Sequence, residues 1–586
     1  MKAWRRAMVL LTAALCILLY PACKSNKEPK PEDSNIVSDF LLDRSAPASN
    51  PSQTVSGLPG KNPSETNANP VDPSSSHANH PDASLPDTVN SNVPTKTNHT
   101  NLRLHGAVGD GVTDDAAALQ AALQAVGNDG CITIPQGTYA IGTSLTIPQN
   151  VVLKVENGGK LVVKEGILLT INGWVEAGYY SIFGGSGSLA GVIKGAGCPQ
   201  WFGAAGDGMT DDTAAFQKAV DRLDHVMVPY KAAKYKLGTV TFSKKVVLEG
   251  VGSDRIDILS ARCSAKNGKL FIINSSNVAI RNFTFTVSGT ADATSVLLYF
   301  DNGTKAMSDI EIENIYSSSA GYTIKDAADT AHPIRNVALR RITASFGSNT
   351  GLYLSGFEKG IVMEEVLVNE VGMPASAITF PLMVVKNCKG LKIRDLDVAG
   401  GFSFDPSNPG RGGDGLVMEN CQNVTAQRFM ADYINGYCLR LHNCANLQLD
   451  SWVMSLYEDG AVYMEGVRNS SFRLLKLNGI WGSAASTHPG TAFMMKNCWD
   501  NTFDNTIVQQ NLSEAMRIEN SSRNVFNSLI VLSNNGDGYV ETGSCSGNRL
   551  RGAVFSDNKG KDIQKADAAD MIFGSVIDGQ YKQKGL

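Results

Sequence analysis

GLVMENCQNVTAQRF (residues 415–429) contains a pattern that recurs several times in the sequence after it. The pattern consists of a Gly or Ala, an alternating apolar run, an Asn with a small residue, and a second apolar run. Related segments begin at Gly436, Gly460, Gly490, Ala515 and Gly538, at intervals of 21, 24, 30, 25 and 23 residues. Each run has a period of two and is too short for a helix. Repeats of this length predict a solenoid, in which every unit winds its strands onto those of the unit before.

A small residue recurs at one point of each repeat, which predicts a buried turn position stacked along the solenoid axis. We assign to it Cys388, Cys421, Cys444, Ser470, Cys498, Ser521 and Cys545. Asn residues precede it (Asn420, Asn443, Asn469, Asn497, Asn520) and follow it (Asn423, Asn446, Asn501, Asn524, Asn548). Since Asn tolerates a left-handed backbone and bonds turn amides, we expect stacked Asn ladders. Nine cysteines remain beyond Cys16 and Cys23, and we expect free buried thiols.

The composition fits a turn-dense all-β protein, with 57 glycines among 586 residues. A net charge of −4 gives no basis for a nucleic-acid partner. We expect no metal centre, and oligomeric state is open.

Residues 1–22 have the form of an export signal, in which an apolar stretch from Ala7 to Tyr20 follows Lys2, Arg5 and Arg6. With Ala22 before Cys23, the segment resembles a bacterial lipoprotein signal. That resemblance implies a lipid on Cys23 and a membrane-anchored protein of the cell envelope, in the outer membrane or periplasm. Tyr20 and Pro21 depart from the usual lipoprotein pattern, so secretion without a lipid is the alternative. Residues 23–100 are rich in Pro, Ser, Asn, Asp and Thr, which predicts a disordered tether.

Two copies of a start module follow, over residues 101–200 and at the beginning of the main solenoid, residues 201–586. GAVGDGVTDDAAALQAALQAV from Gly106 returns as GAAGDGMTDDTAAFQKAV from Gly203, with Asp110 and Asp207 97 positions apart. The apolar spacing predicts a short amphipathic helix in each copy. Thr-Asp-Asp before each helix predicts an N-cap with negative charge at the positive end of the helix dipole. We expect these helices to seal or brace the solenoid.

GAxGDGxTDDTAAxQ and the strands after it resemble the start of right-handed parallel β-helix proteins of the pectate-lyase-like superfamily, which includes polygalacturonases, rhamnogalacturonases, epimerases and phage tailspikes. The resemblance covers about Leu102 to Asp557 and implies an all-β right-handed parallel β-helix with short capping helices. It also implies a protein that acts on polysaccharides. Polygalacturonase motifs are incomplete here: Asp414 and Glu458-Asp459 lie near the acidic positions, whereas Gly-His-Gly and Arg-Ile-Lys are absent.

Alignment of the repeats on the small-residue position predicts two outward columns of side chains. One contains Lys386, Glu419, His442, Arg468, Lys496 and Glu519, and the other contains Arg440, Met494 and Arg517. Acidic residues recur just before the strand, at Asp414, Glu458, Asp459, Glu514 and Asp537. Taken one at a time, each of these residues is explained by a solvent-exposed sheet face with alternating charges, without any role in binding or catalysis. Long segments before the same strand contain Arg411, Trp481 and His488, and we expect them to wall a groove over the charged face.

Three functions are compatible with such a groove; we expect the first, a glycoside hydrolase, and the other two are its alternatives. As an inverting glycosidase, the protein would use Asp414 and Asp459 as acid and base, with Glu458 as a further candidate. Coils stacked at about 4.8 Å predict a separation of roughly 9–10 Å between the two Asp residues. As a polysaccharide lyase or epimerase on uronate-containing glycans, with calcium as a possible cofactor, it would use Arg440, His442 and Lys496. The third function is a non-catalytic glycan-binding stalk. In each case Glu419, Lys496, Arg411, Trp481 and His488 would contact the sugar.

Overall fold

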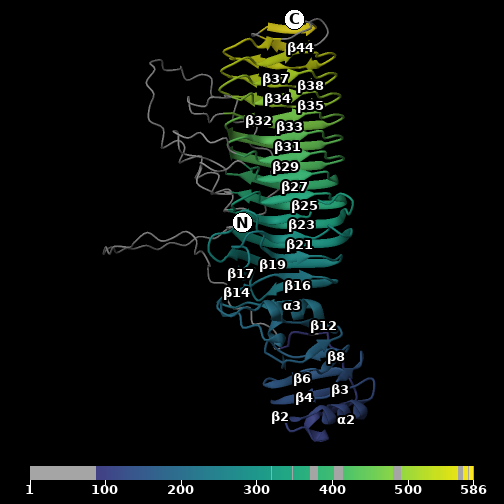
Figure 1. Ribbon diagram of the computed structural model, residues 1–586. Helices are drawn as coiled ribbons and strands as arrows, with labels where there is room; N and C mark the ends of the chain where they lie inside the picture. Colours follow the sequence, from purple (N-terminus) through teal and green to yellow (C-terminus); the bar gives the residue numbers. More distant parts are fainter. Residues whose placement is uncertain are drawn as a thin grey trace, which may run out of the picture. The chain divides into compact units, whose positions relative to one another are not determined.

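The computed structural model describes residues 88–90, 92–318, 320–345, 347–369, 380–400, 413–479, 490–564, 572–577 and 580–584. The predicted signal, Cys23 and most of the predicted tether lie outside these residues. The described residues all belong to one compact unit. As predicted, this unit is an all-β right-handed parallel β-helix, with strands stacked coil upon coil (Figure 1).

One side of each main coil is a short strand, and these strands form a sheet of 13 that we call the short-strand sheet. Each strand pairs in parallel with that of the next coil. The members are β15 (Val240–Phe242), β18 (Lys269–Ile273), β20 (Val296–Phe300), β22 (Tyr322–Asp326), β24 (Leu352–Ser355), β26 (Met383–Lys386), β28 (Leu416–Glu419), β30 (Tyr437–His442), β32 (Gly460–Glu465), β34 (Phe493–Lys496), β37 (Met516–Glu519), β40 (Tyr539–Thr542) and β43 (Ile563–Gln564).

The rest of each coil belongs to a sheet of 25 strands, the long-strand sheet. Its members are β1 (His99–Asn101), β3 (Cys131–Ile134), β6 (Val152–Val155), β9 (Trp174–Glu176), β12 (Ile193–Gly197), β13 (Leu223–Pro229), β14 (Tyr235–Leu237), β16 (Val246–Val251), β17 (Ile256–Ser260), β19 (Val278–Val287), β21 (Met307–Ser318), β23 (Ile334–Ser345), β25 (Glu358–Asn369), β27 (Lys389–Ala399), β29 (Thr425–Ile434), β31 (Gln448–Tyr457), β33 (Ser471–Asn478), β35 (Thr502–Asp504), β36 (Ile507–Gln509), β38 (Val525–Asn527), β39 (Ile530–Leu532), β41 (Arg549–Arg551), β42 (Val554–Ser556), β44 (Ile572–Ile577) and β45 (Gln580–Lys584).

The longest of these strands turn a corner at a residue with a left-handed backbone. Examples are Asn314 (φ 53°) within β21, Asp395 (φ 56°) within β27 and Arg428 (φ 57°) within β29. In later coils the strand is interrupted at this corner, as between β35 and β36 around Asn505 (φ 55°). Each coil therefore has three faces, and the corner inside the long strands was not predicted.

The turn after the short-strand sheet carries the predicted stack of small residues and Asn, with one correction. The backbone pairings link Gln422, Ala445, Arg468 and Trp499, which places Val467 between Cys444 and Cys498. Ser470 and Asn469 therefore lie three residues beyond the positions predicted for them. The mistake arose because this coil has neither Asn nor Cys at the aligned turn and reads Gly466-Val467 instead.

The Asn residues form four sets of hydrogen bonds between successive coils. Asn420 donates to Asn387 over 3.1 Å, and Asn446 donates to Asn423 over 3.1 Å, both at the surface with φ near 55°. A buried ladder runs one residue further along the chain, through Asn501, Asn524 and Asn548. A fourth set, which was not predicted, joins Asn511, Asn534 and Asn558. All nine described cysteines are free and eight are buried, as predicted.

Aromatic rings stack inside the solenoid at nearly the spacing of its coils. Phe472, Phe503 and Phe526 lie parallel, with ring centroids 4.6 and 4.7 Å apart and interplanar angles of 9° and 10°. All three rings are buried. The repeat of the sequence is thus converted into a continuous apolar core, because identical side chains fall above one another.

The first module contains two further small sheets. These are β2 (Asp110–Asp114), β4 (Gly137–Ile141), β7 (Gly159–Val163) and β10 (Phe183–Gly184), and β5 (Leu145–Ile147), β8 (Leu168–Ile171) and β11 (Ser188–Ala190). It is joined to the main solenoid because β12 pairs with both β9 and β13. Packed structure is present before residue 100, since Val89 is buried and donates its backbone N–H to the carbonyl oxygen of Ala177. The tether predicted over residues 23–100 therefore overlaps packed chain.

Both predicted helices are present, α2 (Ala116–Val126) and α3 (Thr213–Arg222), each after a short helical turn, η1 (Leu102–His105) and η2 (Pro199–Phe202). Within the predicted Thr-Asp-Asp cap the N-cap position falls on Asp115 and not on Thr113, whose Oγ1 donates to Asp110 over 2.8 Å. Asp115 lies at the N-cap and turns its carboxylate back to the N–H groups of Val108 and Gly109. The second copy repeats every one of these contacts around Asp207 and Asp212, which confirms the duplication.

Candidate functional site

The candidate site lies on the outward face of the short-strand sheet. One column of paired residues reads Lys386, Glu419, His442, Glu465, Lys496 and Glu519. Glu465 stands where Arg468 was predicted, because Arg468 belongs to the turn after the strand. Lys386 pairs with Glu419 at 2.7 Å and Lys496 with Glu519 at 3.4 Å. Most of this column is thus neutralised by its neighbours along the axis.

The second column places the guanidinium of Arg440 beside the ring of Tyr463 on the next coil. It reads Val417, Arg440, Tyr463, Met494 and Arg517, so that the predicted Arg440, Met494 and Arg517 are joined by Tyr463. Sequence reasoning missed Tyr463 because its coil was aligned wrongly. The usable signal was its place in GAVYMEG, two residues before the outward Glu465.

Arg440 is held by Asp414 from the preceding coil. Its Nε donates to Asp414 Oδ2 over 2.5 Å and its Nη2 to Oδ1 over 3.2 Å, while the backbone N–H of Tyr437 donates to the same Oδ1 over 2.8 Å. The side chain of Asp414 is only 14% exposed and that of Arg440 is 32% exposed. Burial by itself would lower the pKa of Arg440, but the hydrogen bonds to Asp414 leave it raised. The guanidinium is therefore fixed, charged and partly accessible, with three of its five N–H groups not used by Asp414.

Two tyrosine rings enclose this guanidinium. Its carbon lies 5.0 Å from the ring centroid of Tyr437 and 4.6 Å from that of Tyr463, and the two rings meet edge to face at 5.3 Å. Such cation–π contacts restrain Arg440 on the sides that Asp414 leaves open. We call Asp414, Arg440, Tyr437 and Tyr463 the arginine clamp.

Ionisable groups beside the clamp have shifted pKa values. Burial, with a contribution from the Asp459 carboxylate, raises the pKa of Tyr437 to about 12. Burial and the neighbouring Glu465 raise the pKa of Tyr463, whose hydroxyl donates to Glu465 over 3.1 Å. Burial and then Asp459 raise the pKa of Glu458. The two phenols therefore stay protonated well above neutral pH, and Glu458 holds its proton more tightly than a free glutamate does.

Asp414 and Asp459 are two coils apart along the axis but not in register. Strand pairing places Asp414 level with Tyr437 and Gly460, so that Asp459 lies one residue earlier in its coil. Both oxygens of Asp414 accept hydrogen bonds from Arg440, which occupies the positions that a general acid or base would need. His442 lies on the same face of β30 as Arg440, two residues further on.

Trp481, His488 and Arg411 lie outside the described residues, as do most of the long segments that contain them. The chain enters β26, β28 and β34 directly after those segments, and these three strands belong to the same sheet. Among the residues that are described, no three His, Cys, Asp or Glu side chains are grouped to hold a metal ion. No described helix has the length and apolar character needed to span a membrane.

Comparison with known proteins agrees with the fold. Residues 99–166 match the family described as Rhamnogalacturonase A/epimerase, pectate lyase-like, and residues 414–575 match the right handed beta helix region. The chain therefore has the fold of the pectate-lyase-like β-helix proteins. The two matches lie at opposite ends of the described coils, and both agree with the right-handed parallel β-helix. A search of curated proteins finds no match.

Solved structures similar to this chain include an epimerase and phage proteins. The A-module of mannuronan C-5 epimerase AlgE6 from Azotobacter vinelandii shares 13% identity and a TM-score of 0.35, over 65% of this chain and 98% of that one. Tailspike protein 3 of bacteriophage CBA120 shares 11% identity and a TM-score of 0.43, over 63% of this chain and 59% of that one. The N-terminal fragment of gene product 12 of bacteriophage phi29 shares 11% identity and a TM-score of 0.35, over 82% and 95%. These are similarities of fold only.

Proposed function

We propose that the protein is a polysaccharide lyase or epimerase that removes the proton beside the carboxylate of a uronate unit. The observation that carries this proposal is the arginine clamp, in which Asp414 and two aromatic rings hold Arg440 charged and partly exposed. The reaction develops negative charge on the uronate carboxylate as the adjacent proton leaves. A fixed guanidinium that faces that charge lowers the barrier, since it needs no rearrangement during the reaction.

The groups around the clamp can supply the proton transfers. His442, on the same face of β30, is our candidate for the base that accepts the proton from carbon. Tyr437 and Tyr463 are protonated at neutral pH, as a phenol ordinarily is, and burial raises the pKa of each further. In a lyase one of them would protonate the departing glycosidic oxygen, and in an epimerase it would return a proton to the opposite face of the carbon. Asp414 is a positioning residue in this proposal.

A glycoside hydrolase is the second candidate, and Glu458 supports it. Its raised pKa and the adjacent Asp459 carboxylate resemble the separation of roles between acid and base in glycosidases. Asp414 is the weaker partner because Arg440 occupies both of its oxygens. Glu458 and Asp459, rather than Asp414 and Asp459, would then be the catalytic carboxylates.

One experiment separates these reactions. The purified protein is incubated in deuterated water with a panel of polyuronates and neutral glycans, while deuterium in the sugar, unsaturated uronates and reducing ends are followed together. Deuterium at the carbon beside the carboxylate, or unsaturated product, is expected for the proposal, because both require that proton to leave. Reducing ends with neither signal would overturn it in favour of the hydrolase. The same reactions with and without a chelator test for calcium.

Variants assign the signal to the clamp. Arg440→Ala is expected to lower kcat/KM at least about 30-fold, since loss of a hydrogen-bonded charge at a partly buried site costs 2–5 kcal/mol or more. Arg523→Ala is the matched control, because Arg523 makes the same two-bond pair with Asp500 but on an exposed turn. Equal activity of the Arg440→Ala and Arg523→Ala variants would show that the arginine clamp takes no part in the reaction.

We also propose attachment to the cell envelope through a lipid on Cys23. Mass spectrometry of the mature N-terminus tests it: a diacylated Cys23 is expected, and an unmodified terminus elsewhere would favour plain secretion.

A further inference from the structure

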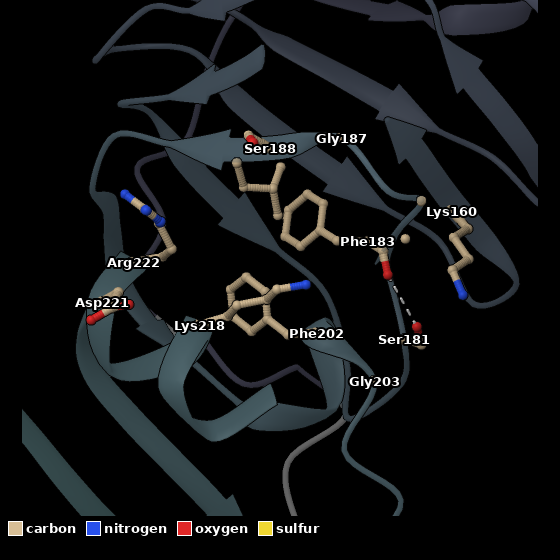
Figure 2. Close-up of a pocket in the computed structure, with 13 residues that line it drawn as sticks. Lys160, Ser181, Phe183, Gly187, Ser188, Phe202, Gly203, Lys218, Asp221 and Arg222 are labelled. Carbon is tan, nitrogen blue, oxygen red and sulfur yellow. Dashed lines mark hydrogen bonds between the residues drawn. The ribbon is translucent and has the colours of Figure 1, made fainter. Parts of the chain in front are cut away.

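A cavity of about 450 Å³ lies where the first start module meets the second, apart from the arginine clamp. Its lining comes from β7, β10 and β11 of the first module and from η2 and α3 of the second (Figure 2). This volume lies within the range of small-ligand sites and is large for a bare oxyanion. The cavity therefore has room for a sugar ring where the two start modules meet.

The charge of the lining is positive although the protein as a whole is acidic. Lys160, Lys218 and Arg222 contribute three cations, against the single carboxylate of Asp221. Figure 2 shows Lys160 on one side of a pair of aromatic rings and Arg222 with Asp221 on the other. Asp221 accepts a hydrogen bond from Gln217 over 3.0 Å, and Arg222 donates to Gly191 over 3.4 Å. Because the cavity walls have a low dielectric constant, the positive potential of these side chains acts strongly on a ligand inside the cavity.

The two lysines are not neutralised by the protein. Within the described chain, neither Lys160 nor Lys218 lies within ion-pair distance of a carboxylate, whereas Lys154, Lys386 and Lys496 on the sheet faces all do. An unpaired ammonium beside a cavity has its charge available for an anionic ligand.

The rest of the lining suits a sugar. Phe183 and Phe202 stack at 5.5 Å with an interplanar angle of 29° and form a rigid apolar wall. Ser181 and Ser188 supply hydroxyl groups, and Gly184, Gly185 and Gly187 bring the backbone to the surface. A Cβ on Gly184 would come within 2.8 Å of Lys160 Cε, so the absence of a side chain there lets Lys160 lie along the wall. An apolar wall, hydroxyls and cations together match a ring that carries hydroxyls and an acidic group.

We propose that this cavity binds one anionic sugar unit, a saccharide that carries a carboxylate or a sulfate ester. The site is distinct from the arginine clamp and would hold a glycan chain at the first module whether or not the clamp is catalytic. It does not depend on the proposed function.

Calorimetric titration of the full-length protein tests the proposal, with galacturonate, glucose 6-sulfate, galactose and inorganic sulfate as probes. We use the Arg440→Ala background, so that the clamp contributes nothing. At least one anionic sugar is expected to bind at least tenfold more tightly than galactose, and more tightly than sulfate alone. The two anionic sugars distinguish a carboxylate from a sulfate ester. Equal affinity for galactose, equal affinity for bare sulfate, or no binding of either anionic sugar would overturn the proposal.

Three variants locate the binding. Lys218→Ala with Arg222→Ala is expected to weaken the anionic sugar at least tenfold, whereas the exposed Lys305→Ala control, outside the cavity, is expected to change nothing. Asp221→Asn removes the only carboxylate of the lining and is expected to tighten binding severalfold, a gain that a damaged fold does not produce. Unchanged affinity in both the double variant and Asp221→Asn would place the ligand elsewhere and refute the site.

Discussion

Replacement of Asn524 by Ala tests whether the buried Asn ladder carries the stability of the C-terminal coils. Asn524 Oδ1 accepts from Asn501 N and Nδ2 over 3.1 and 3.0 Å, and its Nδ2 donates to Cys498 O and Asn548 Oδ1, each over 3.1 Å. The side chain is fully buried. All four hydrogen bonds disappear in Asn524→Ala.

The cost follows from what each partner retains. Asn501 Nδ2 keeps Val467 O, Cys498 O keeps the N–H of Ser522, and Asn548 Oδ1 keeps the backbone N–H of residue 524. The backbone N–H of Asn501 loses its acceptor in a buried site, which costs about 1–3 kcal/mol. With three further lost bonds at roughly 0.5–1 kcal/mol each, we expect a loss of about 2.5–6 kcal/mol.

The assay is hydrogen exchange of the backbone amides, because a solenoid need not unfold in one step. Amides of residues 498–527 are expected to exchange much faster in Asn524→Ala than in the wild type. Asn527→Ala is the matched control, since that side chain makes one hydrogen bond, to Asp504 over 2.7 Å, at a half-buried position. Equal protection in the two variants would refute the ladder as a source of stability.

Other predictions concern the core, the pH dependence and the clamp. Phe503→Ala removes the middle ring of the stack and is expected to cost about 3–5 kcal/mol, measured by urea unfolding, whereas a loss below 1 kcal/mol would show that the stack closes up. Burial raises the pKa of Asp326 to about 8, so the folded protein keeps a proton that the unfolded chain has released. Stability should therefore fall by up to about 1.4 kcal/mol per pH unit from about pH 4 to about pH 8, and Asp326→Asn should flatten that slope in pH-dependent unfolding. Parallel curves for variant and wild type would contradict this assignment. Tyr463→Phe keeps the ring against Arg440 but removes its proton, and is expected to lower kcat about 10- to 100-fold with KM little changed. A change in KM alone would limit Tyr463 to binding.

The fold could be predicted because the repeat appears at several levels of the sequence at once. Three features of the sequence specify stacked parallel strands: the apolar alternation, the Asn at each turn and the duplicated Gly-Asp-Gly segment. Each of them reflects the local backbone conformation that the fold needs at those residues. The corner inside the long strands escaped prediction for the same reason. Its left-handed position is held by Arg341, Glu365 or Arg428 as well as by Asn, so no residue type marks it.

The candidate site was predicted less well, since its geometry depends on register across coils. One coil of different turn sequence shifted the alignment by three residues, which exchanged Arg468 for Glu465 and hid Tyr463. The role of Asp414 could not be predicted either. A recurring acidic residue before a strand looks the same in sequence whether it faces solvent or binds an arginine of the next coil. Only the contact with Arg440 shows which it does.

The chain ends with a reversal of direction. Strand β44 stacks in parallel on β41 and β42, and β45 then pairs with β44 in the antiparallel sense. A solenoid that stopped at β44 would present a strand ready to template the first coil of another molecule. The final hairpin offers a strand of the opposite polarity, which does not continue the parallel lattice. The parallel stacking of coils therefore stops at β44 within the described chain, and the edge strand beside it runs against the direction of the coils.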